Sequence, residues 1–236
     1  MNYNYMHYYL MYYLTGFIML PTFIFALFCQ IKVKTSFNKY SSITSRSGMT
    51  GADAAWRILQ LNGITDVKIR KVSGTLTDYY DPKAKEICLS DDVFSSRSIA
   101  AIGVACHEAG HACQHNQEYF PLKLRNFVIP ATRIGSSLGI PLCLIGLLIN
   151  STTLAYVGII LYCFVALFQL ITLPVEFNAS KRALENISEN GFLSSEEYVG
   201  AKKVLTAAAL TYVAALASAL ASIFRLLIIV SGGRRR

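Results

Sequence analysis

The sequence predicts a mainly α-helical, multi-pass membrane protein that carries one small α+β domain. Two observations support this fold class. Of the 236 residues, 53% are hydrophobic and only 15% are charged, and the apolar residues form four long runs. A bilayer core requires about 20 apolar residues of helix. We therefore expect four transmembrane helices rather than buried helices of a soluble protein, which are seldom so apolar on all sides. The runs are residues 8–31, 127–149, 153–173 and 204–230.

The four runs divide the chain into five expected parts. We interpret the first run as an uncleaved anchor, because it lacks the basic start of a signal peptide and is long for one. The second and third runs are separated by only a few residues, so they form a helical hairpin. The expected parts are an N-terminal transmembrane anchor (1–31), a polar α+β domain (32–125), a transmembrane hairpin (126–174), surface helices (175–203) and a C-terminal transmembrane helix (204–236).

The polar segment contains the expected α+β elements. Residues 50–64 predict a helix that begins after Thr50 as its N-cap. Residues 67–72 alternate apolar and basic side chains, as a half-buried strand does. A second strand is expected over residues 85–89, after a turn at an Asp-Pro pair. The extended segment around Thr75 to Leu89 is expected to offer a strand edge with which another extended peptide can pair.

A further helix, predicted over residues 99–116, contains three of the four histidines. Its stretch HEAGH, residues 107–111, matches the pattern H-E-x-x-H. Residues four apart lie on one face of a helix, so His107 and His111 can bind one zinc ion beside an open position for water. Zinc lowers the pKa of such a water to about 7. Glu108 is then the candidate catalytic base.

Two imidazoles and a water leave zinc one protein ligand short. His115 lies about 12 Å along the helix axis from His107, which is too far to share the ion. Glu176 directly follows the third apolar run, and the hairpin returns it to the side of the H-E-x-x-H helix. It can supply the third ligand, or it can pair with Lys181 or Arg182 at the membrane surface. Ser180, one turn later, can hydrogen-bond a ligating imidazole.

The chain resembles the small bacterial membrane zinc metallopeptidases, the neutral zinc metallopeptidases of YugP type. The resemblance covers nearly the whole chain and rests on LTDYYDPKAKEICLS, on SIAAIGVACHEAGHACQH followed by YFPLKLRN, and on LPVEFNASKRAL. The last segment is also similar to one in the HtpX-like membrane proteases, of the gluzincin group. The resemblance implies a zincin-like domain with Zn²⁺ held by His107, His111 and Glu176, and Glu108 as the base.

Two positions depart from these relatives. HtpX-like enzymes have aspartate where this chain has Ser180, and YugP-type proteins often have aspartate where it has Asn178. Both residues neighbour the expected carboxylate ligand. The departures therefore concern the surroundings of the metal and not the ligands themselves.

Together these features predict a membrane-embedded zinc endopeptidase that cleaves membrane or membrane-proximal proteins at the bilayer surface. Its expected partners are a protein or peptide substrate and the lipid bilayer. No nucleic acid is expected, since no basic stripe interleaves with aromatic residues. Two alternatives are a non-catalytic scaffold that binds metal and an intramembrane-cleaving protease. The apolar lead-in to the motif, IAAIGVAC, is too short for a span and favours the surface. The sequence carries no signal for an oligomeric state.

The distribution of basic residues predicts an integral protein of the bacterial cell membrane with its catalytic domain on the cytoplasmic side. The net charge is +8, which favours a membrane surface. The closing Arg234, Arg235 and Arg236 lie on the opposite side from the polar domain. The basic residues on the side of the polar domain are Lys32, Lys34, Lys39, Lys123, Arg125, Lys181, Arg182, Lys202 and Lys203.

Overall fold

The computed structural model describes residues 3–233, with side chains described for residues 15–232. It confirms the predicted fold class, because four of its helices are long and apolar enough to cross a bilayer and its strands form one three-stranded sheet. The three closing arginines, residues 234–236, lie outside the described residues. The chain forms two compact units, each assembled from separate segments. The five-part division expected from the sequence stays a prediction.

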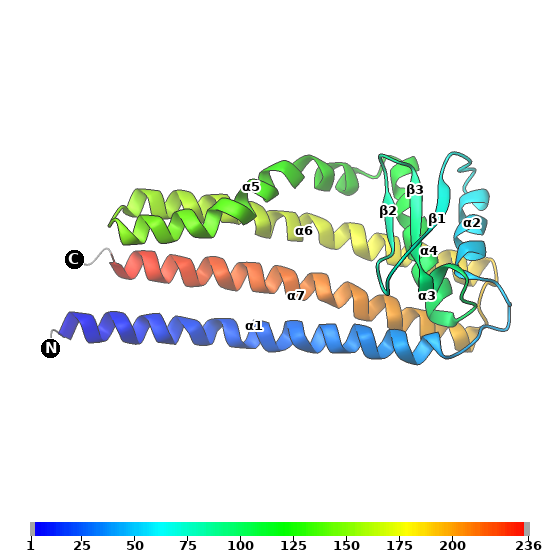
Figure 1. Cartoon of the computed structure of the whole chain (residues 1–236), viewed down its shortest axis with the longest axis horizontal. Coiled ribbons are helices and arrows are strands. Elements are labelled where there is room, and N and C mark those ends of the chain that lie inside the picture. The colour runs from blue at the N-terminus through cyan, green and yellow to red at the C-terminus, as the bar shows by residue number, and fades with distance from the viewer. Residues whose placement is uncertain (1–2, 234–236) are drawn as a thin grey trace. The chain divides into compact units, whose positions relative to one another are not determined.

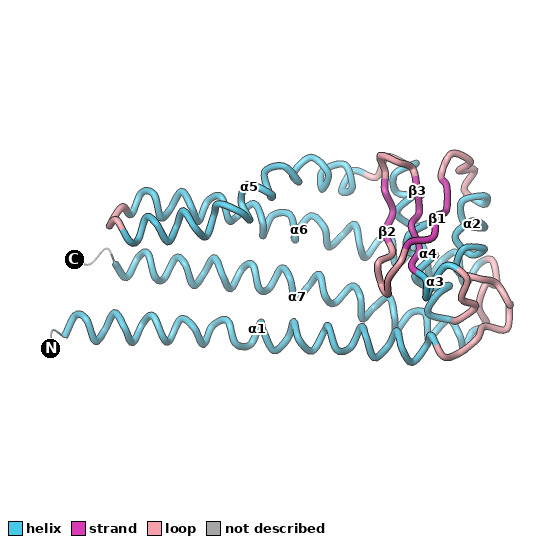
Figure 2. The backbone as a smooth tube through the Cα atoms, viewed as in Figure 1, coloured by secondary structure: helices cyan, strands magenta, loops and turns pink. Residues whose placement is uncertain are grey.

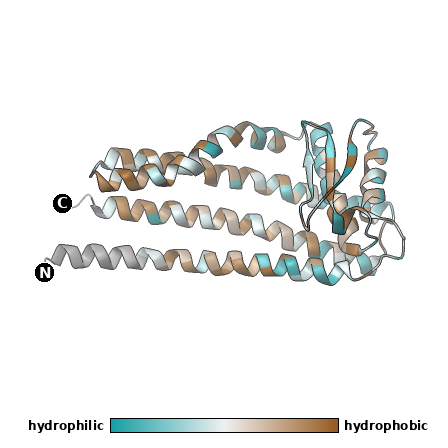
Figure 3. Ribbon diagram, viewed as in Figure 1, coloured by the Kyte–Doolittle hydropathy of each residue, from teal (hydrophilic) through white to brown (hydrophobic). Residues whose placement is uncertain are grey.

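The first unit comprises Met1–Phe28, Leu124–Leu173 and Thr211–Arg236. Figure 3 shows hydrophobic residues along the helices that belong to this unit. Many of their apolar side chains are exposed, as Phe127 and Leu148 are at 80% and 81%. An apolar surface of this extent is typical of helices that face lipid. The four helices are α1 (Tyr3–Ser41), α5 (Phe120–Leu148), α6 (Thr152–Glu189) and α7 (Ser195–Gly233).

Helices α5 and α6 form a hairpin around the turn at residues 149–151. Two glycines permit their backbones to approach closely. A Cβ atom on Gly158 would collide with the backbone of Cys143, and one on Gly146 would collide with the backbone of Ala155. Small residues at such contacts are typical of helix packing in membranes.

Helix α6 continues through Pro174. Proline removes one backbone donor, but apolar helices tolerate it because the freed groups find other partners. The third apolar run and Glu176 therefore belong to one continuous helix.

The second unit comprises Cys29–Lys123 and Pro174–Leu210. Its sheet has the order β1-β3-β2, with β1 parallel and β2 antiparallel to β3, and Figures 1 and 2 show the three strands side by side. Strands β1 and β2 therefore form the edges of the sheet. Besides the ends of α1, α6 and α7, the unit contains α2 (Gly51–Leu61), β1 (Lys68–Val72), β2 (Tyr79–Asp81), β3 (Glu86–Ser90), α3 (Asp91–Phe94) and α4 (Ile99–Asn116).

Local sequence signals explain where the helices of this unit begin. Thr50 caps α2 and forms a capping box with Asp53, in which each side chain accepts from the backbone of the other. Ser98 caps α4 by accepting from the backbone of Ala101 at 3.1 Å. The observed limits of α4 coincide with the predicted helix over residues 99–116. Strand β2, only three residues long, was not predicted.

Helix α4 lies in the core of the second unit. Its side chain Ile102 is fully buried, together with Ile58 of α2, Ile87 of β3 and Ile187 of α6. Gly103 lets α4 approach α7, where a Cβ atom would lie 3.3 Å from the Cβ of Ala201. Because α4 is packed on several sides, the histidines that it carries have a rigid support.

Candidate metal centre

Helix α4 places His107 and His111 one turn apart on one face. Their ring centroids are 4.8 Å apart and the ring planes are nearly perpendicular, at 82°. Both side chains are largely buried, with 15% and 11% of their surface exposed. The H-E-x-x-H spacing therefore produces the pair of imidazoles that the sequence predicted.

Glu176 of α6 meets both imidazoles. Its Oε2 lies 3.3 Å from Nε2 of His107 and 3.6 Å from Nε2 of His111. Within the part of the chain that the structure describes, these residues form the one group of three potential metal ligands, with ligand atoms within 4.8 Å of one another. Lys181, the alternative partner for Glu176, instead pairs with Glu185 at 3.5 Å. The structure thus brings together the three predicted ligands.

The three side chains fit a zinc ion. Two ligands of tetrahedral zinc, each about 2.0–2.1 Å from the ion, lie roughly 3.3 Å apart. The observed Nε2···Oε2 separations, 3.3 and 3.6 Å, agree with this spacing. Two imidazoles and one carboxylate are a ligand set of catalytic zinc sites, whereas structural sites usually use four protein ligands. This site would keep one coordination position open.

Each imidazole is held through its other nitrogen. Ser180 Oγ lies 3.1 Å from Nδ1 of His107, and Gln114 Oε1 lies 3.0 Å from Nδ1 of His111. These contacts orient both rings so that Nε2 faces Glu176. Ser180 was expected in such a role from its place one turn after Glu176. The role of Gln114 was not expected from the sequence. Its position three residues after His111 puts it on the same helix face, and this spacing is the signal that could have revealed the contact.

Glu108, the candidate base, is buried next to the ligands with 8% of its surface exposed. Burial raises the pKa of its carboxyl group, while the imidazoles of His107 and His111 act in the opposite direction. For His111, burial by itself would lower the pKa, but the hydrogen bond to Glu176 and the nearby charge of Glu108 raise it overall. A carboxylate with a raised pKa is a better proton acceptor than an exposed one.

A glycine within the motif lets the two ligand-bearing helices approach. A Cβ atom on Gly110 would lie 2.8 Å from the carbonyl oxygen of Ala179 on α6. Real Cβ atoms avoid so short a contact with backbone, so a larger residue would push α4 and α6 apart. The carboxylate of Glu176 on α6 can lie close to both histidines because α4 and α6 pack closely at Gly110.

His115 lies outside the ligand group, as its spacing along the helix predicted. Its Nδ1 is 2.7 Å from the hydroxyl of Tyr80. Burial raises the pKa of Tyr80 to about 12, so the hydroxyl stays protonated at neutral pH and shares a hydrogen bond with the ring. This contact joins the end of α4 to the edge strand β2.

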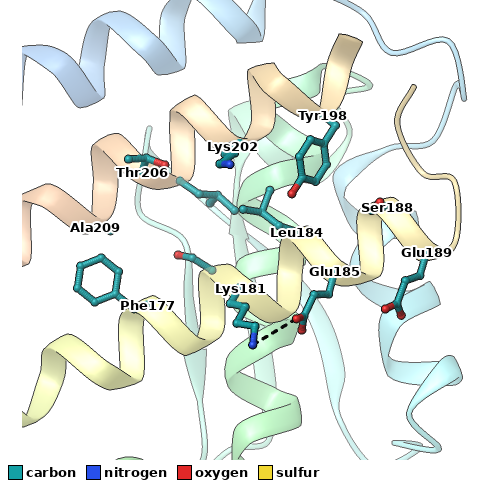
Figure 4. Close-up of a pocket in the computed structure, with 12 residues that line it drawn as sticks. Phe177, Lys181, Leu184, Glu185, Ser188, Glu189, Tyr198, Lys202, Thr206 and Ala209 are labelled. Atoms are coloured by element: carbon teal, nitrogen blue, oxygen red, sulfur yellow. Dashed lines mark ion pairs between the residues drawn. The ribbon is translucent and has the colours of Figure 1, made fainter. Parts of the chain in front are cut away.

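A pocket of about 470 Å³ lies between α6 and α7. Ser180, whose hydroxyl contacts His107, forms part of its wall. Figure 4 shows Phe177 and Leu184 on the side of α6, Tyr198 and Thr206 on the side of α7, and the ion pair between Lys181 and Glu185. The lining residues are Phe177, Ser180, Lys181, Leu184, Glu185, Ser188, Glu189, Tyr198, Lys202, Leu205, Thr206 and Ala209.

Comparison with known proteins yields two matches that cover most of the chain. A family described as "Putative neutral zinc metallopeptidase" matches residues 15–231. The "Putative membrane protease YugP" of Bacillus subtilis (strain 168) is 48% identical over 209 residues, which are 89% of this chain and 93% of that protein. No solved structure matches this chain.

Proposed function

This chain belongs to the neutral zinc metallopeptidase family, and on that premise we propose that it is a gluzincin-like, membrane-embedded zinc endopeptidase. The proposal rests on the convergence of Nε2 of His107, Nε2 of His111 and Oε2 of Glu176. The open coordination position favours catalysis over a purely structural metal site. Its substrates would be the peptide bonds of membrane or membrane-proximal proteins.

The chain's own residues have distinct tasks in this proposal. When bound, zinc supplies a Lewis acid for the peptide carbonyl and lowers the pKa of a water to about 7. Glu108 accepts the proton of the attacking water and transfers it to the leaving amine. Ser180 and Gln114 hold the imidazoles of His107 and His111 in the orientation that the ligand set requires.

We place the site at the surface of the bilayer. Helix α4 is not among the four described helices that are long and apolar enough to cross a membrane. Charged side chains such as Lys181 and Glu185 are exposed close to Glu176 in the sequence. The distribution of basic residues favours the cytoplasmic side. A reporter fused to the N-terminus tests this orientation. A second unit that is exposed outside the cell would overturn it.

The variant Glu108→Gln tests the catalytic role. It should retain zinc and melt like the wild type, because the motif histidines and Glu176 are unchanged. Cleavage of fluorescence-quenched peptides by the protein in liposomes should fall by about 10²–10⁴-fold, the usual contribution of a general base. Glu185→Gln, which neutralises an exposed acid on α6, is the matched control and should cleave normally.

Each possible failure of this experiment has a separate meaning. Cleavage that survives Glu108→Gln would show that another group is the base. Purified wild type that holds zinc but cuts no peptide would support the scaffold alternative. Wild type that holds no zinc would overturn the proposed metal site altogether.

A further inference from the structure

Gln114 is a fully buried polar side chain in the core of the second unit. None of its surface is exposed, and it is among the largest side chains buried to this degree in the described residues. A buried amide must be satisfied by hydrogen bonds. Gln114 has three partners: Nδ1 of His111 at 3.0 Å, the carbonyl oxygen of Val175 at 2.8 Å and Oδ1 of Asn178 at 2.9 Å.

These partners determine which way the amide of Gln114 faces. The backbone carbonyl oxygen of Val175 can only accept, so the group beside it must be the amide nitrogen. Oε1 of Gln114 therefore faces His111 and accepts a hydrogen bond from Nδ1. A neutral imidazole that carries its hydrogen on Nδ1 has its lone pair on Nε2. That is the nitrogen beside Glu176.

The same amide also holds the segment of α6 that carries the carboxylate. Val175 immediately precedes Glu176, and Asn178 follows it by two residues. Both accept from Nε2 of Gln114. A single side chain on α4 thus contacts one imidazole and the backbone next to the carboxylate.

A second set of contacts secures the outer end of this arrangement. Oδ1 of Asn178 also accepts from Nε of Arg182 at 2.7 Å. Arg182 Nη1 in turn donates to Oε1 of Gln117 at 2.6 Å, which returns to the end of α4. Asn178 acts only as an acceptor in these contacts.

We propose that Gln114 is a positioning residue for the metal centre, which presents Nε2 of His111 for binding and ties α4 to α6 beside Glu176. This inference rests on the proposed function of the three ligands as a zinc site. It goes beyond that function because Gln114 itself binds neither metal nor substrate.

The first test compares the same substitution at two glutamines of the second unit. Gln114→Met keeps the length of the side chain but removes all three contacts. Gln60→Met makes the same change at an exposed position of α2 and leaves the contacts of Gln114, Asn178 and Arg182 untouched. Zinc affinity is measured on the full-length protein in detergent by competition with a chelator, and thermal unfolding of the zinc-free protein reports on folding.

Gln114→Met should bind zinc about 10–100-fold more weakly, the usual effect of removing an outer-sphere partner. Gln60→Met should bind like the wild type. A folded Gln114→Met protein with wild-type affinity would overturn the proposal, as would an equal loss of affinity in both variants.

The second test needs no change at Gln114 and therefore holds even if Gln114→Met does not fold. In zinc-loaded wild type with ¹⁵N-labelled histidine, NMR should show the Nδ1 hydrogen of His111 protected from exchange with water, because it is donated to the buried Oε1 of Gln114. The signal is identified by its loss in His111→Asn. An Nδ1 hydrogen that exchanges as fast as that of an exposed histidine would overturn the proposal. If the wild type binds no zinc, the proposed function fails; if it binds zinc but either test fails, only the role of Gln114 does.

Discussion

The side-chain nitrogen of Gln114 lies 2.8 Å from the carbonyl oxygen of Val175, a residue 61 positions away in the sequence. This contact joins the two helices that supply the candidate ligands. Helix α4 contributes two imidazoles and the candidate base, and α6 contributes the carboxylate of Glu176. The chemistry of the site therefore depends on how closely and in which register α4 and α6 pack.

Replacing Glu176 should remove the third ligand. In Glu176→Gln the side chain keeps its size but loses the negative charge that zinc favours. Zinc affinity should fall by more than the 10–100-fold typical of an outer-sphere partner. Metal analysis of the purified protein measures the loss, with Glu185→Gln of the same helix as the control. A full complement of zinc in Glu176→Gln would rule out Glu176 as a ligand.

Ser180 should contribute less than a direct ligand. Ser180→Ala leaves Nδ1 of His107 without its hydroxyl partner, so we expect zinc affinity to fall by about tenfold. Ser180→Asp should preserve or increase the affinity, because a carboxylate partner raises the basicity of a ligating imidazole. Chelator competition compares the zinc affinity of both variants with that of the control Ser188→Ala, because Ser188 lines the same pocket as Ser180. Unchanged affinity in Ser180→Ala would show that the contact does not tune the metal.

The close approach at Gly110 should be sensitive to a single methyl group. In Gly110→Ala the new Cβ would lie 2.8 Å from the carbonyl oxygen of Ala179, so α4 and α6 must separate. Overpacking of this kind costs about 1–3 kcal/mol, and zinc binding should weaken because the carboxylate moves with α6. Thermal unfolding with and without zinc measures both effects.

The control for this substitution is Gly16→Ala in α1. No atom lies within 4 Å of a Cβ atom at that position. Alanine is favoured over glycine inside a helix by about 0.5–1 kcal/mol, so the melting temperature should stay constant or rise. Equal melting temperatures for Gly110→Ala and the wild type would show that the two helices adjust without cost.

Several elements could be predicted because their causes are local. The limits of α4 follow from Ser98 as its cap and from the lack of a breaker before Pro121. The spacing of His107 and His111 on a helix is sufficient to place both rings on one face. Strand β2 could not be predicted in the same way, since three residues form a strand only by pairing with β3.

The sequence by itself determined the four apolar helices, the helix that carries the H-E-x-x-H motif and the pairing of its two imidazoles. These features depend on side-chain hydrophobicity and on interactions within one or two helical turns. Only the tertiary structure decided that Oε2 of Glu176 lies 3.3 Å from His107 and that Gln114 supports His111. Both relationships require two helices distant in the sequence to pack in one register, which no local pattern of residues specifies.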